Sequence, residues 1–310
     1  PRISNACCAS ACGNPSTLDI PACQGHRALG YSRRTMKLNI VPARTGLQWV
    51  RQGITVFWRQ PMALSALFFM TMAAMSLATL LPLVGPAVAL ALLPSATLAM
   101  MVAAAEASQN RTPTPALMLV AFRTGKQRLN AMMSLGAMYA VGFLGVMGLS
   151  ALIDGGEFAR VYLGGAPLTR EVAESGDFQA AMWLAMLLYV PLSLLFWHAP
   201  GLVHWHNVPP VKALFFSIVA CWRNFGAFTV YGLSWLGVFL AAGLAMSLLV
   251  TLLAAVGIGA SMAGGIMVAT AMMLAAMFFT SVVFTFRDSF APPDTQTNGD
   301  EPAPGADPSH

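Results

Sequence analysis

Two long runs of the sequence contain no Asp, Glu, Lys or Arg, and they limit the folds that the chain can adopt. The first covers Pro61–Ala105, which is 45 residues, and the second covers Phe225–Phe286, which is 62 residues. A helix that crosses a bilayer needs about 20 apolar residues, so each run is long enough for two spans. Only 9% of all residues are charged, whereas soluble domains have about 25%. A soluble globular fold is therefore excluded, and we expect an integral membrane protein.

Turn residues and a polar loop divide the apolar sequence into six predicted spans. Pro and Gly within Leu80–Val88 interrupt the first run, and glycines within Ala254–Gly265 interrupt the second. Two further uncharged runs, Leu129–Ile153 and Gln179–Val203, flank the polar loop. The sequence therefore predicts an all-α membrane protein with six transmembrane helices arranged as three hairpins. The predicted spans cover residues 62–81, 84–105, 130–153, 179–203, 226–254 and 264–286.

The Lys and Arg residues fall almost entirely on one side of these spans. Counted from Met36, eleven lie before the first span, between hairpins or after the last span, whereas two lie in the polar loop of residues 154–177. That loop also holds five acidic residues. Because Lys and Arg in short loops stay in the cytoplasm, we expect a multi-pass protein with cytoplasmic N- and C-termini and an outward-facing acidic loop.

Each predicted hairpin follows a stretch that ends in an aromatic residue, Arg and a polar residue. The three copies are FWRQ at Phe57–Gln60, AFRT at Ala121–Thr124 and CWRN at Cys221–Asn224. Prolines precede the second and third copies, and Pro suits the first turn of a helix. We therefore expect a repeated unit, in which a cytoplasmic amphipathic elbow helix precedes each transmembrane hairpin.

The cytoplasmic segment of residues 36–61 has the clearest amphipathic pattern. One helical face carries Leu47, Val50, Ile54, Phe57 and Trp58, and Arg and Gln side chains lie opposite. We expect this helix to rest on the inner leaflet, with its apolar face in lipid and its Arg side chains near phosphates. Over the three elbows, the expected lipid-contacting residues are Arg44, Arg51, Trp58, Arg59, Arg123, Lys126, Trp222 and Arg223.

The stretch FWHAPGLVHWHNVPP, residues 196–210, is rich in His and Trp. His198, His204 and His206 do not share one helical face, and no Asp, Glu or Cys lies within ten residues to complete a metal site. The tryptophans fit an aromatic belt. We therefore expect a membrane boundary here and no metal. The alternatives are a functional His198 in a cavity and a metal site at His204 and His206.

Prolines within the predicted spans suggest a second type of function. Pro94 and Pro191 lie inside spans, where Pro kinks a helix. Together with His198 they mark a candidate cavity for a small-solute transporter. The spans hold no carboxylate except Glu106 at an edge, which argues against ion-coupled transport.

The two ends of the chain are predicted to be disordered. Residues 1–35 have no apolar segment of the secretory type, and we expect them to be an extension from an over-long gene model that precedes a start at Met36. The alternative is a zinc knuckle, because Cys8, Cys12, Cys23 and His26 are spaced almost like zinc ligands. The tail of residues 287–310 is rich in Pro, Asp and Gly and should be a disordered cytoplasmic tail.

Several motifs resemble those of an uncharacterised family of small betaproteobacterial inner-membrane proteins. They are MKLNIVPARTGLQWVRQGI (36–54), FWRQPMALS (57–65), LLFWHAPGLVHWHNVPPVKALFFS (194–217) and ACWRNFGA (220–227). The resemblance covers residues 36–286. More distantly, the plan of elbow helix and hairpin is similar to other bacterial multi-pass families and to the membrane part of some glycerophosphodiester phosphodiesterases. The resemblance implies a bacterial inner-membrane location and this fold, but no reaction.

The sequence contains no phosphate-binding loop, nucleophile motif or paired carboxylates in its apolar body. We therefore expect a non-enzymatic structural or accessory protein that binds no cofactor. Its expected partners are the bilayer, anionic phospholipid headgroups and either another membrane protein or a second copy, but not nucleic acid. The alternative function is the small-solute transporter described above.

Overall fold

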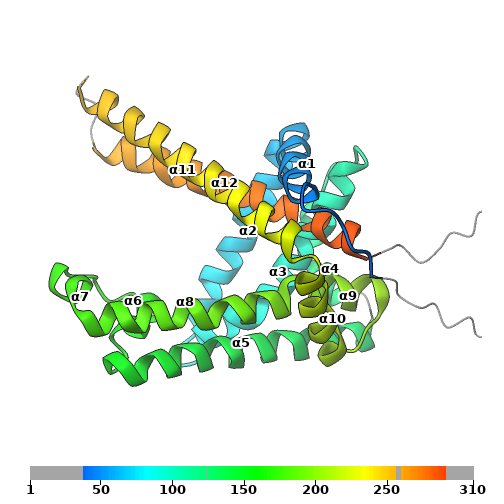
Figure 1. The fold of residues 1–310 in the computed structure, drawn as a ribbon, viewed down its shortest axis with the longest axis horizontal. Coiled ribbons are helices and arrows are strands. Elements are labelled where there is room, and N and C mark those ends of the chain that lie inside the picture. Colours follow the sequence, from blue (N-terminus) through cyan, green and yellow to red (C-terminus); the bar gives the residue numbers. More distant parts are fainter. Residues whose placement is uncertain (1–37, 124, 256–259, 291–310) are drawn as a thin grey trace, which may run out of the picture. The chain divides into compact units, whose positions relative to one another are not determined.

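The computed structural model describes residues 38–290, without residue 124 and residues 256–259. Over these residues the backbone is helical apart from short connections, and Leu38 and Phe290 form an isolated antiparallel bridge (Figure 1). The predictions for residues 1–35, including the cysteine pattern, and for the tail beyond residue 290 lie outside the described residues. The predicted tail was wrong for residues 287–290, because residues 287–289 complete α12 and Phe290 is buried. The described part therefore has the all-α fold that the sequence predicts.

Six helical segments of this part are long and apolar enough to cross a membrane, and each overlaps one predicted span. The helices that form them are α2 (Pro61–Thr79), α3 (Gly85–Ser108), α5 (Lys126–Asp154), α8 (Gly176–Trp197) with α9 (Ala199–His206), α11 (Phe225–Ala255) and α12 (Ala260–Ser289). The shorter helices are α1 (Thr45–Arg59), the 3-10 helix η1 (Pro115–Leu119), α4 (Val120–Arg123), α6 (Glu157–Gly164), α7 (Arg170–Glu174) and α10 (Pro210–Arg223).

The polar loop begins with a turn that the sequence encodes locally. Helix α5 ends at Asp154 and is followed by Gly155 and Gly156. Their φ angles of +65° and +88° lie in the region that favours glycine. The carboxylate of Asp154 accepts hydrogen bonds from the backbone N–H groups of Gly156 and Phe158, at 2.8 and 2.6 Å. These bonds satisfy donors at the start of α6, so the chain reverses and a new helix starts at once.

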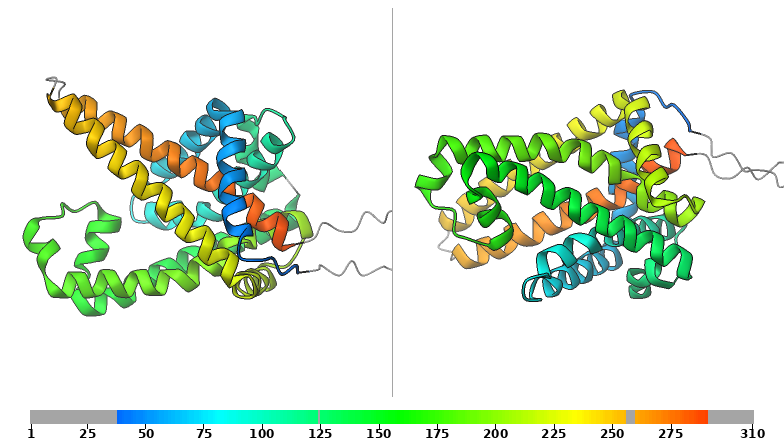
Figure 2. Two further views of the ribbon diagram at one scale, coloured as in Figure 1. Left: turned by 45° about the horizontal axis from the view of Figure 1, so that its top comes forward. Right: turned by 90° about the horizontal axis from the view of Figure 1, so that it is seen from below.

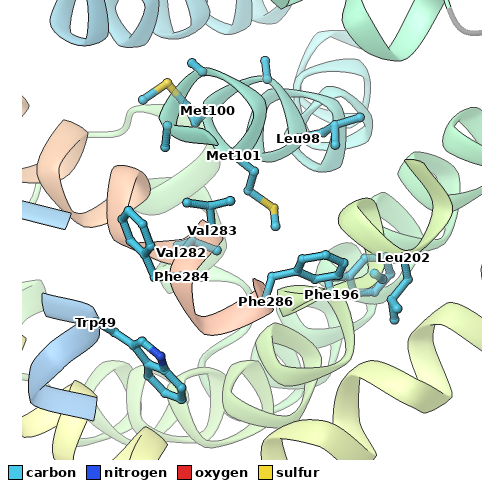
Figure 3. Close-up of a cluster of buried hydrophobic side chains, with 14 of the residues drawn as sticks. Trp49, Leu98, Met100, Met101, Phe196, Leu202, Val282, Val283, Phe284 and Phe286 are labelled. Carbon is cyan, nitrogen blue, oxygen red and sulfur yellow. The ribbon is translucent and has the colours of Figure 1, made fainter. Parts of the chain in front are cut away.

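The core is formed where α3 packs against α2, α5 and α12. Figure 3 shows side chains of α3 and α12 in one cluster with Trp49 of α1 and Phe196 of α8. Helix α5 approaches α3 closely at Gly136, where an added Cβ atom would lie 2.1 Å from the carbonyl oxygen of Ala91. Close approach at small residues is a common way for helices to associate in membranes.

Helix α1 is part of this core, which corrects the prediction that its apolar face lies in lipid. It packs against α11 and α12. Val50 and Phe57, assigned to a lipid face, are buried in the protein, whereas Leu47 and Trp58 remain exposed. Trp49 is fully buried and was not on the predicted face. Periodicity identified an amphipathic helix but not whether lipid or protein covers it.

Two glycines allow α1 to come this close. A Cβ atom at Gly46 would lie 2.1 Å from the carbonyl oxygen of Ala227 in α11. A Cβ atom at Gly53 would lie 2.3 Å from Cβ of Ser281 in α12. Real Cβ atoms do not occupy such positions, so the packing of α1 depends on glycine at both sites.

The second predicted elbow is not a continuous helix. Residues 115–123 form η1 followed by the four-residue α4. The helical elbow expected around Ala121–Thr124 is thus replaced by two short turns, and residue 124 lies outside the described residues.

The fourth predicted span is broken at His198. Helix α8 ends at Trp197 and α9 begins at Ala199, so His198 belongs to neither helix and links the two. Pro200 has no N–H group and cannot bond to the carbonyl of Phe196, which accounts for the break. Pro191, which the sequence analysis also considered a kink, lies within continuous α8.

Helices α11 and α12 lie alongside each other in Figure 1 and in the left panel of Figure 2. The apolar side chains on the outer half of α11 are largely exposed: Leu240, Leu244 and Leu248 have exposed fractions of 60%, 74% and 63%. A soluble protein would not present such a surface. It fits a helix that contacts lipid, as the length and composition of the span also require.

Candidate functional site

The three predicted lipid-contacting arginines of α1 lie on its exposed side. Arg44, Arg51 and Arg59 are exposed, opposite the face that packs against α11 and α12. Within the described residues, no carboxylate pairs with any of the three. Trp58 is 58% exposed beside Arg59. The helix therefore presents unpaired positive charge next to an exposed indole.

Helix α10 has two distinct faces. Its small and polar residues are buried, and the helix packs against α8 and α9. The opposite face carries exposed apolar side chains at intervals of four, seven and three residues. They are Val211, Phe215 and Trp222, continued by Phe225 at the start of α11, with exposed fractions of 70%, 61%, 75% and 66%. This spacing forms one stripe along a helix.

Two exposed cations accompany this stripe. Lys212 lies in the first turn of α10 and Arg223 is its last residue. Neither has a carboxylate partner among the described residues. The combination of an apolar stripe with cations at both ends is typical of a helix at a membrane interface.

The predicted lipid-contacting residues around the second elbow also lie on the surface. Arg123, the last residue of α4, and Lys126, the first of α5, are both exposed. Phe122 is 38% exposed beside them. Lys126 additionally lines a polar cavity with Gly125, Gln127, Arg128 and Asn207.

His198 lies in a buried polar cluster and has no exposed surface. Its Nε2 atom is 3.3 Å from the hydroxyl oxygen of Thr285, and its Nδ1 atom is 3.8 Å from the sulfur of Cys221. The backbone N–H of His198 donates to the hydroxyl of Ser217, which donates in turn to the carbonyl of Leu194. The cluster thus ties the break between α8 and α9 to α10 and α12.

The hydrogen bonds fix the tautomer of His198. Thr285 donates its only hydroxyl proton to the carbonyl of Val282, at 2.7 Å, and accepts from the indole of Trp197, at 3.1 Å. The imidazole must therefore donate from Nε2 to Thr285, which leaves Nδ1 as an acceptor 3.8 Å from the sulfur of Cys221. Burial raises the pKa of that thiol to about 12, so Cys221 keeps its proton. Both ring nitrogens of His198 are used within the protein.

The candidate cavity residues are not gathered around an opening. Pro191 is exposed on α8, whereas Pro94 is buried within α3. The two described cavities are lined by other residues, one of them between α11 and α12.

His204 and His206 lie in the last turn of α9, at the end of the fourth candidate span. In the part of the chain that the structure describes, no three His, Cys, Asp or Glu side chains are grouped to hold a metal ion. His206 contacts Phe286 at a ring distance of 5.9 Å, and His204 contacts Trp205 at 5.4 Å. They lie among aromatic side chains.

Asn224 joins three parts of the fold, which sequence reasoning missed. Its Oδ1 atom accepts from the backbone N–H of Val41, at 2.8 Å. Its Nδ2 atom donates to the carbonyls of Asn39 and Ala220, at 3.0 and 3.1 Å. The side chain therefore holds the segment before α1 against the junction of α10 and α11. The recurrence of the aromatic–Arg–polar pattern was the only signal that could have pointed to it.

A second buried polar group connects α11 and α12. The hydroxyls of Tyr231 and Ser281 are 2.7 Å apart, and the indole of Trp235 donates to Ser281 at 3.2 Å. These contacts join residues 46 to 50 positions apart. Sequence reasoning did not single them out, because each residue alone fits an ordinary apolar span.

Comparison with known proteins gives one clear relative. A probable inner membrane protein of Burkholderia thailandensis is 38% identical over 258 residues, which cover 82% of this chain and 94% of that protein. No protein-family model matches the sequence, and no solved structure matches it.

The name of the relative indicates the inner membrane, and the six apolar helical segments indicate several membrane crossings. Together they support a multi-pass protein of the inner membrane. The match spans nearly all of the relative, so it reflects the whole membrane domain rather than one motif. The chain therefore belongs to the family of this Burkholderia inner membrane protein.

Proposed function

We propose that the protein is a non-enzymatic component of the inner membrane that binds anionic phospholipid headgroups at the cytoplasmic leaflet. In this arrangement the six spans form three hairpins, the chain termini are cytoplasmic, and α1, η1 with α4, and α10 lie at the cytoplasmic surface. Its role is to organise the membrane or to assist a partner complex.

The exposed stripe of α10 carries this proposal. Its inner face is fixed to the protein, so Phe215 and Trp222 project from a helix that cannot turn to bury them. At a membrane surface, the aromatic side chains enter the headgroup region and Lys212 and Arg223 approach the phosphates. A membrane interface accommodates both the apolar stripe and the cations.

The charges of α1 extend the same surface chemistry. Arg44, Arg51 and Arg59 are unpaired within the described residues, and each basic residue near an anionic surface contributes about 1 kcal/mol to membrane affinity. Since α1 is held by α11 and α12, most of its apolar face is covered, and its arginines add mainly charge to this surface.

The test is native mass spectrometry of the full chain released from nanodiscs that contain phosphatidylglycerol and phosphatidylcholine. The double variant Lys212→Glu with Arg223→Glu should lower the retention of phosphatidylglycerol about tenfold or more. The matched control is Arg160→Glu with Arg170→Glu, which reverses two exposed charges at the acidic loop. Equal retention by wild type and the α10 variant would refute the proposal.

The same spectra address the alternative of a small-solute transporter. A retained solute that disappears in His198→Ala would favour a transport cavity. Retention of phospholipid alone, unchanged by His198→Ala, would favour the lipid-binding role.

A further inference from the structure

A polar cavity lies between the start of α5 and the end of α9. It has a volume of about 440 Å³ and is lined by Gly125, Lys126, Gln127, Arg128 and Asn207. The first four residues are consecutive, and Asn207 is brought beside them from 79 residues further along the chain than Arg128. The cavity is thus a product of the tertiary fold and not of one local turn.

The charges around this cavity are all of one sign. Lys126 is exposed and Arg128 is half-buried, and neither has a carboxylate partner among the described residues. No Asp or Glu lines the cavity. The remaining polar groups, Gln127 and Asn207, have amides that can donate hydrogen bonds. Two neighbouring cations without a counter-charge attract an anion to this cavity.

His204 provides a further unused polar atom close by. It lies one helical turn before Asn207, and the charge of Arg128 acts on its imidazole. The Nδ1 atom of His204 is buried and has no hydrogen-bond partner in the described part of the chain. Buried polar atoms are nearly always paired, so an unpaired atom indicates a missing partner.

The backbone adds donors at the same place. Helix α5 has no side-chain cap and no acidic residue in its first turn. The N–H groups of its first residues therefore lack acceptors within the helix. Gly125 has φ of +94°, and an added Cβ atom there would meet nothing within 4 Å, so the approach to these donors is open.

We propose that this cavity binds a phosphate group, with Lys126 and Arg128 as its counter-charges and Asn207 and Gln127 as hydrogen-bond donors. Arg suits phosphate because its planar group offers paired donors. The phosphate can come from the headgroup of an anionic phospholipid or from free inorganic phosphate, because both offer the same chemistry. The first source rests on the proposed function.

The experiment measures bound phosphatidylglycerol and bound inorganic phosphate on the full chain by native mass spectrometry. The double variant Lys126→Gln with Arg128→Gln should bind at least about tenfold more weakly, because two charge-assisted hydrogen bonds are lost. A matched control is Arg111→Gln, an exposed residue of the same connecting segment whose side chain bonds only to Gln109 among the described residues. It should bind like the wild type.

A second variant tests the cavity without removing its cations. Asn207 has φ of +52°, a conformation that Asp also tolerates, so Asn207→Asp should fold and place a negative charge in the cavity. Binding should fall as in the double variant. The circular dichroism spectrum and thermal midpoint of each variant should match the wild type, which separates loss of binding from unfolding.

The outcomes identify the source and can overturn the inference. Loss of one tightly held phosphatidylglycerol, with no response to inorganic phosphate, assigns the site to lipid. Displacement by millimolar inorganic phosphate assigns it to the free anion. Unchanged binding of both probes by Lys126→Gln with Arg128→Gln and by Asn207→Asp overturns it. Failure of the proposed function would instead appear in the α10 variants, which leave this cavity intact.

Discussion

The indole Nε1 of Trp49 donates a 2.9 Å hydrogen bond to the Oδ2 atom of Asp288, 239 residues later in the sequence. The other carboxylate oxygen of Asp288 pairs with Arg287 at 3.0 Å. Trp49 is fully buried, so this bond links α1 to the end of α12 from within the core. A second bond, from Arg287 to Gln52, lies at the exposed edge of the same contact.

Trp49→Phe should destabilise the protein by about 1–2 kcal/mol, because the ring remains but the carboxylate loses its donor. The measurement is the thermal midpoint of the detergent-solubilised protein. Trp58→Phe is the matched control, since Trp58 is 58% exposed and its indole donates no hydrogen bond within the described residues. If both variants melt at the wild-type temperature, the bond to Asp288 contributes nothing to stability.

Gly53→Ala should destabilise the protein by about 1–3 kcal/mol, because the new methyl group overlaps Ser281 and α1 must move away from α12. Gly237→Ala in α11 is the control, since nothing lies within 4 Å of its added Cβ atom. That change should be neutral or stabilising, because Ala favours helix over Gly. Equal stability of the two variants would mean that α1 is not packed as described.

The bond between His198 and Thr285 should appear as a coupling in a double-mutant cycle. Thr285→Val and His198→Ala each remove the pair, and their joint effect should be smaller than the sum by about 0.5–1.5 kcal/mol. Thermal or chemical unfolding in detergent supplies the four free energies. Strict additivity would contradict the hydrogen bond.

Cys221 should be unreactive towards thiol reagents while the protein is folded. Its pKa is raised by burial to about 12 from an ordinary value of 9.0, so the thiolate that reacts is scarce at neutral pH. With Cys7, Cys8, Cys12 and Cys23 replaced by Ser, the folded chain should resist a maleimide at pH 8 and react only after denaturation.

The same raised pKa fixes the direction of a pH effect on stability. The unfolded thiol loses its proton near pH 9 while the folded thiol keeps it, so the contribution of Cys221 to stability is complete below pH 9 and falls as pH rises towards 12. Cys221→Ala should remove this slope.

The control for the maleimide experiment is Phe215→Cys in the Cys221→Ala background. Phe215 is exposed on the same helix, so the new thiol should react quickly, which would show that maleimide reaches α10.

The sequence was informative about spans and less so about what covers them. Runs without charge are decisive in a membrane protein, because a charged residue in the hydrocarbon core is costly, and so all six segments could be located. The apolar side of α1 was recognisable from its period, but Val50 and Phe57 meet protein instead of lipid. Gly46 and Gly53 decide that outcome. Their role depends on Ala227 and Ser281, which are distant in the sequence.

The buried polar contacts were harder still to predict. The sequence offers no charged partner for His198 within the spans beyond Glu106 at an edge. Its partners are the neutral side chains of Cys221 and Thr285, which lie 23 and 87 residues away. Neutral partners leave no mark in charge or spacing. The basic residues were easier to identify, because exposure of Arg and Lys follows from the cost of burying them.

The position of α1 against α11 and α12 has a consequence for biosynthesis. The ribosome makes α1 first and its two packing partners last, so the glycine-lined face of α1 has no cover while four spans enter the membrane. The contact between Trp49 and Asp288 can form only when the last helix is in place. Insertion of the last two long helices is therefore the step that completes the fold, and a nascent chain stalled before α12 exposes α1 to the cell's quality-control proteases.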